Sequence, residues 1–183
     1  MRSIRNLRQL PASRALLADD LIEFHAARIL LLHRVCGIKN RIDGLTKLAK
    51  LDFFARYPAF FAEACRARGQ PVPPITVGIE APMVRHHYGP WDKRYYHVLA
   101  LLEGAELLDV KPQPNGSYQF TLTEAGVDRA DALRKSPAHS GVVEQMTHIK
   151  RVFGNKSGDA IKRFIYEQFD REVAQRLLGE TIR

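Results

Sequence analysis

The chain has 183 residues, 45% of them hydrophobic and 26% charged, and its formal net charge is +8. A chain of this size can bury a substantial core, and no window approaches the roughly 20 apolar residues that a membrane span needs, so a membrane-spanning protein is excluded. The positive charge favours acidic partners, nucleic acid first and an acidic protein surface second.

Half of the net charge lies in the first 18 residues, which we interpret as a basic N-terminal arm. The arm contains no acidic residue, and its side chains are suited to a phosphate backbone or an acidic partner. Its basic residues are Arg2, Arg5, Arg8 and Arg14. We expect a folded domain over residues 19–135 and a helical extension over residues 136–183.

The N-terminus and the cysteines both indicate a cytoplasmic protein. The arginine-rich N-terminus lacks a long apolar run before a cleavage site, so we expect no signal peptide. Cys36 and Cys65 lie far apart in apolar segments and are expected to be buried thiols in a reducing compartment.

Amphipathic segments predict three helices in the first half of the chain. Asp19 or Asp20 is expected to cap the first, a strongly apolar helix that ends before Gly37. The second, DGLTKLAKLDFFARYP, ends at Pro58 and is followed by a third in AFFAEACRARG. On the second helix we expect three polar side chains to face water, namely Lys47, Lys50 and Asp52. Residues 69–82 contain four prolines and two glycines and are expected to form a loop or an extended passage.

The next segment, RHHYGPWDKRYY, is expected to begin the central helix of the fold. Gly89 breaks the chain and Pro90 presets the first helical turn, because its missing N–H would have no partner there. Apolar residues then recur at spacings of three and four up to Leu108, which is typical of a helix that buries one stripe. Three aromatic residues are expected to pack in the core or along this helix, namely Trp91, Tyr95 and Tyr96.

A β-hairpin and a capped helix are predicted after this helix. Residues 107–111 and 118–122 read as two strands, and the Pro-Asn-Gly sequence at 114–116 as the tip between them. Thr123 is expected to cap the helix that follows. Helix, hairpin and capped helix are typical of the recognition helix and wing of a winged helix-turn-helix domain. The predicted fold class is therefore mainly α with a small β-hairpin, with an N-terminal arm and appended C-terminal helices.

Two further helices are predicted, one at about residues 142–153 and one at about 159–178. An apolar stripe on the last helix needs a partner. Two arrangements are equally consistent with this stripe. The helix could fold back on the domain, as terminal helices of winged-helix dimers do, or it could dock on another protein. The residues are Ile161, Phe164, Ile165, Phe169, Val173 and Leu177.

No constellation of residues in the sequence predicts catalysis. His86 and His87 are adjacent, so their side chains diverge on a strand or a helix and do not suit one metal ion. No serine or cysteine has the setting of an activated nucleophile, and no glycine-rich loop is suited to phosphate. We therefore expect a protein that is not an enzyme, with no cofactor and no bound metal.

Direct DNA reading is the weaker of two interpretations for the predicted helix and wing. The outward positions at the start of the helix would be Asp92, Lys93, Arg94 and His97, and the wing carries Lys111 as its clear cation. Lys93 and Arg94 are suited to phosphate or guanine, but Asp92 opposes them. A protein-interaction module is favoured over a sequence-specific DNA reader.

The blocks DGLTKLAKLDFFARYP and MVRHHYGPWDKRYY, followed by LLEGAELLDV and YQFTLTEAG, carry a resemblance. They resemble the small winged-helix middle components of three-component ABC-ATPase systems, the group that includes Lamassu-type anti-phage defence. The similarity covers about residues 37–135, and YGPWDKRYY is its most specific part.

The resemblance implies a non-catalytic subunit that binds an SMC-like ATPase beside a separate effector, often a nuclease, in a bacterial complex that senses double-stranded DNA. The arm and the helices after residue 136 lie outside the matching region. Two alternatives from other classes are a free-standing winged-helix transcriptional regulator, which would bind DNA as a homodimer through its terminal helices, and an antitoxin-like module that blocks a toxin.

Overall fold

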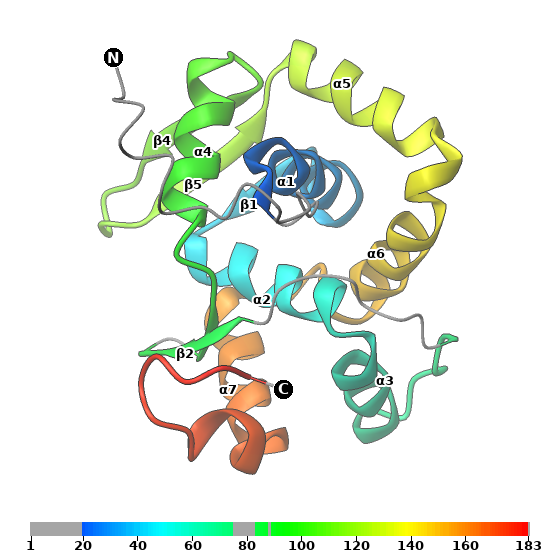
Figure 1. Cartoon of the computed structure of the whole chain (residues 1–183), viewed down its shortest axis with the longest axis vertical. Coiled ribbons are helices and arrows are strands. Elements are labelled where there is room, and N and C mark those ends of the chain that lie inside the picture. Colours follow the sequence, from blue (N-terminus) through cyan, green and yellow to red (C-terminus); the bar gives the residue numbers. More distant parts are fainter. Residues whose placement is uncertain (1–19, 75–82, 88, 183) are drawn as a thin grey trace, which may run out of the picture.

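The computed structural model describes residues 20–74, 83–87 and 89–182. The chain is mainly helical and carries two small antiparallel sheets (Figure 1). The helices are α1 (Ile22–Cys36), α2 (Leu45–Arg56), α3 (Pro58–Ala67), α4 (Tyr95–Gly104), α5 (Glu124–Lys135), α6 (Ser140–Phe153) and α7 (Gly158–Gln168), with a 3₁₀ turn η3 (Pro137–His139) and a π-helical turn η4 (Asp170–Ala174). The strands are β1 (Arg41–Asp43), β2 (Val84–His86), β3 (Gly89–Trp91), β4 (Leu108–Pro112) and β5 (Tyr118–Leu122).

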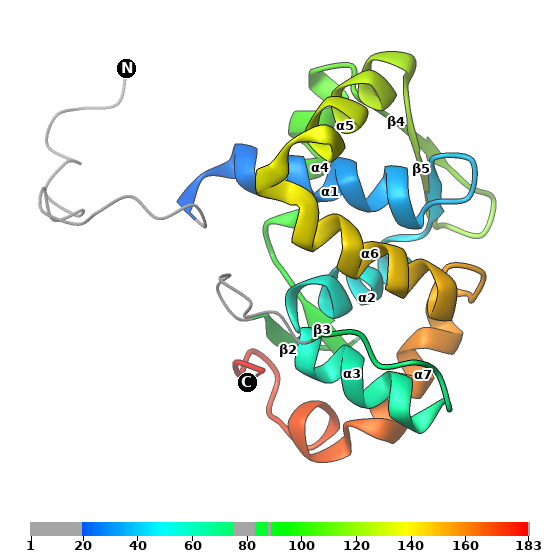
Figure 2. The ribbon, with the colours of Figure 1, turned by 90° about the vertical axis from the view of Figure 1, so that its right-hand side faces the viewer.

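The elements form two groups, and helix α6 contacts both. Helix α1 packs against α4, α5 and β5, whereas α2 packs against α3, α7 and β3 (Figure 2). Helix α1 is central to the first group because its apolar residues occupy most of its circumference. The four successive residues Ile29 to Leu32 are all buried.

The three-stranded sheet has the order β1-β5-β4 and confirms the predicted hairpin. Leu108 pairs with Leu122 and Pro112 with Tyr118, so the connection is residues 113–117, which contain the predicted tip at 114–116. Strand β1 pairs with the other edge of β5 through Ile42 and Phe120. As predicted, Thr123 caps α5 by accepting a hydrogen bond from the Gly126 N–H at 3.0 Å.

The start of α1 differs from the prediction. The helix begins at Ile22, and the residue before it is Leu21, which offers no side-chain cap. Asp20 therefore does not occupy the cap position, and Asp19 lies outside the described residues. The end of α1 is confirmed: the Gly37 N–H donates to the His33 carbonyl at 3.0 Å.

Both cysteines are buried free thiols, as predicted. The Cys36 sulfur donates to the Met146 carbonyl at 3.3 Å. Burial raises the pKa of the Cys36 thiol to about 12, so this side chain stays protonated and poorly reactive at neutral pH.

Helix α4 begins later than predicted because residues 89–91 form a strand. Pro90 lies in β3, opposite Arg85 of β2, and is not the first residue of the helix. Gly89 has φ of 88°, which lets the chain turn back along β2. Residues 89–91 form a strand because of tertiary packing. All of β3 is buried against α2 and α7, and this packing outweighs the local preference of proline for a helix start.

The end of α4 offers a stability prediction. Glu106 has φ of 57° in the turn where the Leu107 N–H donates to the Leu102 carbonyl at 2.9 Å, and its side chain is exposed. Because glycine adopts this conformation without steric cost, Glu106→Gly should raise the free energy of unfolding by about 0.5–1 kcal/mol in urea titrations. Glu103→Gly, inside the same helix, should lower it by about 1 kcal/mol. A loss of stability in both variants would contradict the prediction.

Helix α2 is enclosed more completely than its sequence indicates. The prediction that Lys47, Lys50 and Asp52 face water is wrong, because all three are buried. Helices α1, α6 and α7 and strand β3 approach α2 from different sides, so it has no free polar face. The Lys47 amine instead donates to the Gly154 carbonyl at 2.8 Å, and the Lys50 amine to the Pro90 carbonyl at 2.9 Å.

The apolar stripe of the last helix folds back on the chain. Four of its residues are fully buried, Phe164 packs against the same core, and the rings of Phe60 and Phe169 lie 5.0 Å apart. The buried four are Ile161, Ile165, Phe169 and Val173. They are therefore not an exposed docking surface, because α2 covers this face of α7. Leu177 is the exception, at 72% exposure.

The last predicted helix is also shorter than expected. Helix α7 ends at Gln168, and residues 179–182 run beside β2 as an extended segment. The Arg85 N–H donates to the Glu180 carbonyl at 2.7 Å, and the Ile182 N–H to the Met83 carbonyl at 2.9 Å. The chain thus ends its described part by covering the open edge of the β2–β3 hairpin.

Candidate interaction site at helix α4

Helix α4 has one buried and one exposed face. Its inward residues follow the predicted spacing of three and four, and they are Tyr95, Val98, Leu99 and Leu102. The opposite face carries Tyr96 at 62% exposure and Leu101 at 39%, with Lys93 and His97 also exposed. Tyr96 was expected to pack in the core or along this helix. Its ring does lie 6.3 Å from that of Trp91, but most of the side chain is exposed on the outer face.

Asp92 is buried at the start of α4 instead of facing outward. Its carboxylate accepts hydrogen bonds from Arg56 at 2.7 Å, from the Arg94 backbone N–H at 2.9 Å and from the Arg94 guanidinium at 2.6 Å. Burial by itself would raise the pKa of Asp92, but the hydrogen bonds from Arg94 and Arg56 hold it well below its usual value. Asp92 is therefore a fixed anion that orients Arg94.

A second carboxylate lies deeper, on α2. Asp52 accepts from the Arg28 Nε at 2.7 Å and from the Tyr95 hydroxyl at 2.7 Å. Arg28 is 5% exposed and Asp52 0%, so this pair is shielded from water. Burial, and then the charge of Asp52, raises the pKa of the Tyr95 hydroxyl well above its usual value. The pair ties α1, α2 and the first turn of α4 together.

His25 of α1 connects the two carboxylate clusters. Its Nδ1 lies 3.1 Å from Arg28 Nη1, and its Nε2 lies 2.8 Å from Arg94 Nη1. A guanidinium can only donate, and a neutral imidazole has one acceptor nitrogen, so one of these two contacts at a time is a hydrogen bond. We call His25, Arg28, Asp52, Arg56, Asp92, Arg94 and Tyr95 the α4 anchor network.

Two parts of this network have a local signature in the sequence, and one part has none. Arg56 follows Asp52 by one helical turn, and their side chains lie 3.9 Å apart. Arg28 lies between the apolar residues Ala27 and Ile29 of α1, and an arginine in such surroundings is a sign of a buried ion pair. The contact between Arg56 and Asp92 joins residues 36 positions apart, and no local pattern predicts it.

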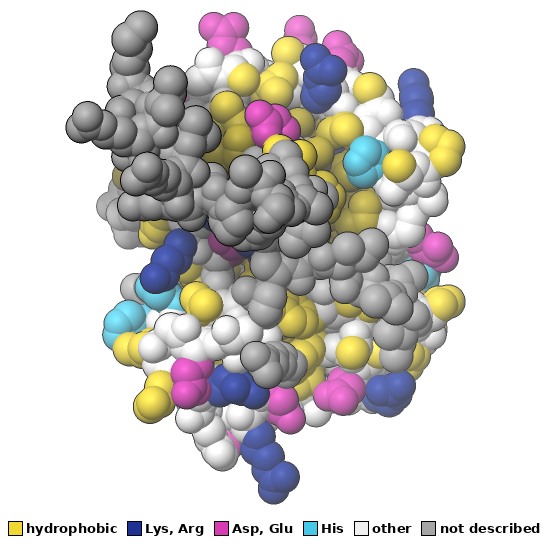
Figure 3. All heavy atoms as spheres, in the orientation of Figure 1, with side chains coloured by type: hydrophobic (Ala, Val, Ile, Leu, Met, Phe, Trp, Pro, Cys, Tyr) yellow, Lys and Arg dark blue, Asp and Glu magenta, His cyan; other side chains and the backbone are white. Residues whose placement is uncertain are grey.

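Three of the residues named from sequence as DNA contacts are described by the structure, and they differ in setting. Lys93 is exposed at α4, Lys111 is exposed on the β4–β5 hairpin, and Arg94 is held by Asp92 and His25. Arg2, Arg5, Arg8 and Arg14 lie outside the described residues. On the face in Figure 3, basic and acidic side chains are interspersed over the part that the structure describes.

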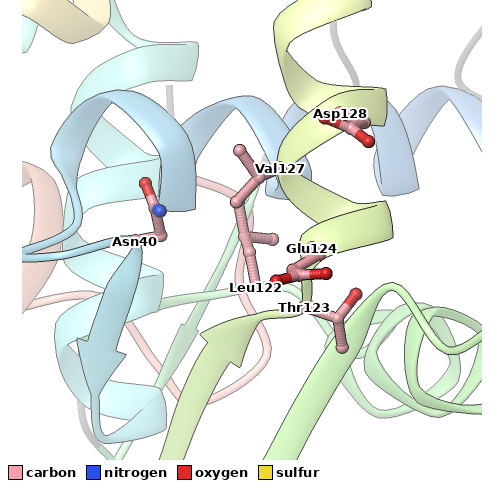
Figure 4. Close-up of a pocket in the computed structure, with 6 residues that line it drawn as sticks. All are labelled: Asn40, Leu122, Thr123, Glu124, Val127 and Asp128. Atoms are coloured by element: carbon pink, nitrogen blue, oxygen red, sulfur yellow. The ribbon is translucent and has the colours of Figure 1, made fainter.

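A shallow pocket of about 460 Å³ lies between the turn that precedes β1 and the start of α5. Leu122 and Val127 supply its apolar lining, and Glu124 and Asp128 line it with carboxylates (Figure 4). The Asn40 carboxamide also lines it and accepts from Arg34 at 3.4 Å. The carboxylates disfavour an anionic ligand, although the pocket adjoins the N-terminus of a helix.

The described residues offer neither a metal site nor a membrane-spanning helix. Among residues 20–74, 83–87 and 89–182, no group of three or more His, Cys, Asp or Glu side chains is placed to hold a metal ion. In the same ranges, no helix combines the length and the apolar character needed to cross a membrane. No protein-family model, curated protein or solved structure matches the chain.

Proposed function

We propose that this chain is a non-catalytic winged-helix subunit that binds a partner protein through the outer face of α4. The arrangement of α1, β1, α2, α4, β4 and β5, with the sheet order β1-β5-β4, supports the winged-helix assignment. In this assignment α4 corresponds to the recognition helix and the β4–β5 hairpin to the wing.

The outer face of α4 carries the proposal of a protein partner. Arg94 is one of the two cations at the start of the predicted recognition helix, and it contacts Asp92 and His25. Tyr96 and Leu101 remain as exposed apolar contacts beside Lys93. Tyrosine is enriched at protein interfaces, whereas a groove-reading helix needs cations and amides at these positions.

The nature of the partner rests on the resemblance of YGPWDKRYY and its neighbouring blocks. We infer an SMC-like ATPase as the direct partner, in a cytoplasmic bacterial anti-phage defence complex with a separate effector. Double-stranded DNA is a secondary ligand in this proposal, through its backbone and through the N-terminal arginines.

A binding experiment with matched variants tests the proposed face. Tyr96→Ala should raise the Kd for the SMC-like ATPase encoded by a neighbouring gene at least tenfold, as measured by calorimetry. The reason is that tyrosines frequently contribute a large share of the binding energy at interfaces. Leu177→Ser is the control, since Leu177 is more exposed than Tyr96 and belongs to the segment after η4, which lies at the end of the molecule away from α4 (Figure 1). Equal weakening by both variants, or no binding to the ATPase, would overturn the proposal.

The rival function, a DNA-binding regulator, makes a different prediction for Lys93. If the rival is right, the wild-type protein shifts a DNA fragment that carries its own promoter, and Lys93→Ala abolishes that gel shift. The wild-type protein then does not bind the ATPase, so Tyr96→Ala has no ATPase interaction to weaken. Arg94→Ala is a poor test, because it also removes a hydrogen-bond donor from the buried Asp92 carboxylate.

A further inference from the structure

The β2–β3 hairpin immediately precedes α4 and is held from three sides. Residues 179–182 pair with β2, and the Tyr166 hydroxyl of α7 donates to the His86 and His87 carbonyls at 3.4 Å each. From α2, Lys50 donates to the Pro90 carbonyl at 2.9 Å. Asp92 follows β3 by one residue, so the hairpin positions the network that anchors α4.

The Lys50 amine lies in a tightly packed, dry position. The side chain is fully buried, and its nitrogen lies 6.0 Å from the centre of the Trp91 ring. A methyl group added to Gly89 would lie 3.4 Å from this nitrogen and 3.1 Å from the Tyr166 ring. There is thus little room for water to solvate a charge on the amine.

The charges around Lys50 do not favour an ammonium ion. Lys162 of α7 and His86 of β2 both interact with it electrostatically, and each carries or can acquire a positive charge. Tyr166 contributes an aromatic ring and a hydroxyl group, and Lys162 has its own carboxylate partner in the exposed Asp159 at 3.0 Å. Burial lowers the pKa of Lys50 to about 7, and the charge of Lys162 acts in the same direction.

We propose that Lys50 is a proton-operated latch that sets how firmly the β2–β3 hairpin holds the start of α4. The neutral amine donates one hydrogen bond to Pro90 and places no charge in the dry site. Protonation places an ammonium ion beside Lys162 and His86, and opening of the hairpin relieves it by admitting water. The effect on partner binding rests on the proposed function of α4, but the latch itself does not.

A fall in pH should favour opening of the β2–β3 hairpin, because opening and protonation of Lys50 are thermodynamically linked. The open hairpin exposes Lys50, whose pKa then approaches its usual value of about 10.4, so the open form takes up a proton at a higher pH than the closed form. Opening should therefore become about tenfold more favourable for each unit that the pH falls from about 10 to about 7, and level off below. Hydrogen exchange of the backbone amides of β2 and β3, corrected for intrinsic rates, should show close to tenfold less protection at pH 7.5 than at pH 8.5. Lys50→Met should remove this difference.

Trp91 is the one tryptophan of the sequence and reports directly on the closed form. Its fluorescence in the wild-type protein should change with a midpoint near pH 7, because the ammonium ion appears close to the indole. His86 stacks on Trp91 at 5.1 Å, so His86→Gln is the matched control and should keep the transition, whereas Lys50→Met should lose it. A transition that survives in Lys50→Met, or that disappears in His86→Gln, would overturn the proposal.

A measurement on the wild-type chain covers the case in which Lys50→Met does not fold. In ¹³C-lysine-labelled protein, one Cε resonance should titrate near pH 7, and it should persist in Lys47→Met. If every lysine titrates above pH 9, the latch is wrong. None of these readouts uses a partner, so the latch and the ATPase interaction can fail independently.

Discussion

Replacing Asp52 by alanine is expected to lower the free energy of unfolding by about 3–5 kcal/mol. The variant leaves the Arg28 guanidinium without its 2.7 Å carboxylate partner and removes the acceptor of the Tyr95 hydroxyl. Both groups are almost completely shielded from water, so solvent cannot replace the lost contacts without disturbing the packing. Urea unfolding followed by circular dichroism measures the loss.

The chain supplies a matched control for this experiment. Arg34 and Asp131 also form a two-bond ion pair, with distances of 3.0 and 3.2 Å, but their side chains are 27% and 26% exposed. Water compensates part of the loss there, so Asp131→Ala should cost about 0.5–1 kcal/mol. Asp52→Asn should fall between the two alanine variants, since it keeps an acceptor but loses the charge. Similar losses in Asp52→Ala and Asp131→Ala would show that burial does not determine the strength of the α4 anchor network.

The protein is expected to lose about 2.5 kcal/mol of stability between pH 7.5 and pH 4.5 through His33. Its Nδ1–H donates to the Ile29 carbonyl at 2.8 Å, which fixes the tautomer, and Nε2 is buried with no hydrogen-bond partner among the described residues. Burial lowers the pKa of His33 to about 4, partly offset by the bond to Ile29. Below about pH 6.5, His33 therefore binds a proton in the unfolded chain but not in the folded chain. The free energy of unfolding falls with pH until about pH 4, where the folded chain binds the proton as well.

Urea unfolding at several pH values separates this contribution from that of the other titrating groups. His33→Leu should remove about 2.5 kcal/mol of the pH-dependent loss, whereas His97→Leu, on the exposed face of α4, should keep the wild-type slope. The hydrogen-bonded carboxylates Asp92 and Asp131 have pKa values below the usual range, so their losses fall at still lower pH. An unchanged slope in His33→Leu would contradict a neutral, buried His33.

The α4 anchor network and the proposed latch both act on how the outer face of α4 is presented to a partner. Tyr96 and Leu101 are displayed because the opposite face of α4 is buried, and the start of the helix is fixed by Asp92. If Lys50 loosens the hairpin that leads into this start, the same outer face is presented less firmly. Partner binding, DNA binding and pH response can thus be separated by Tyr96, Lys93 and Lys50 variants.

Local sequence patterns predicted most of the elements. The β4–β5 hairpin, the Thr123 cap, the buried stripe of α4 and the break between α2 and α3 at Pro58 are confirmed. Each depends on residues within a few positions of one another, through turn chemistry, capping or the helical period. These interactions form in much the same way whatever lies elsewhere in the chain.

The tertiary structure decided which polar residues are buried and where α4 begins. Lys50 and Asp52 were expected to face water, but β3 and α7 enclose α2 around Lys50, and α1 and α4 enclose it around Asp52. Pro90 was expected to start a helix and lies in a strand, since residues 179–182 and α2 hold the hairpin in place. The sequence alone thus determined the local elements, whereas burial depends on contacts between segments far apart in the chain. Those contacts set the local dielectric and the hydrogen-bond partners, and through them the charges on which the candidate site depends.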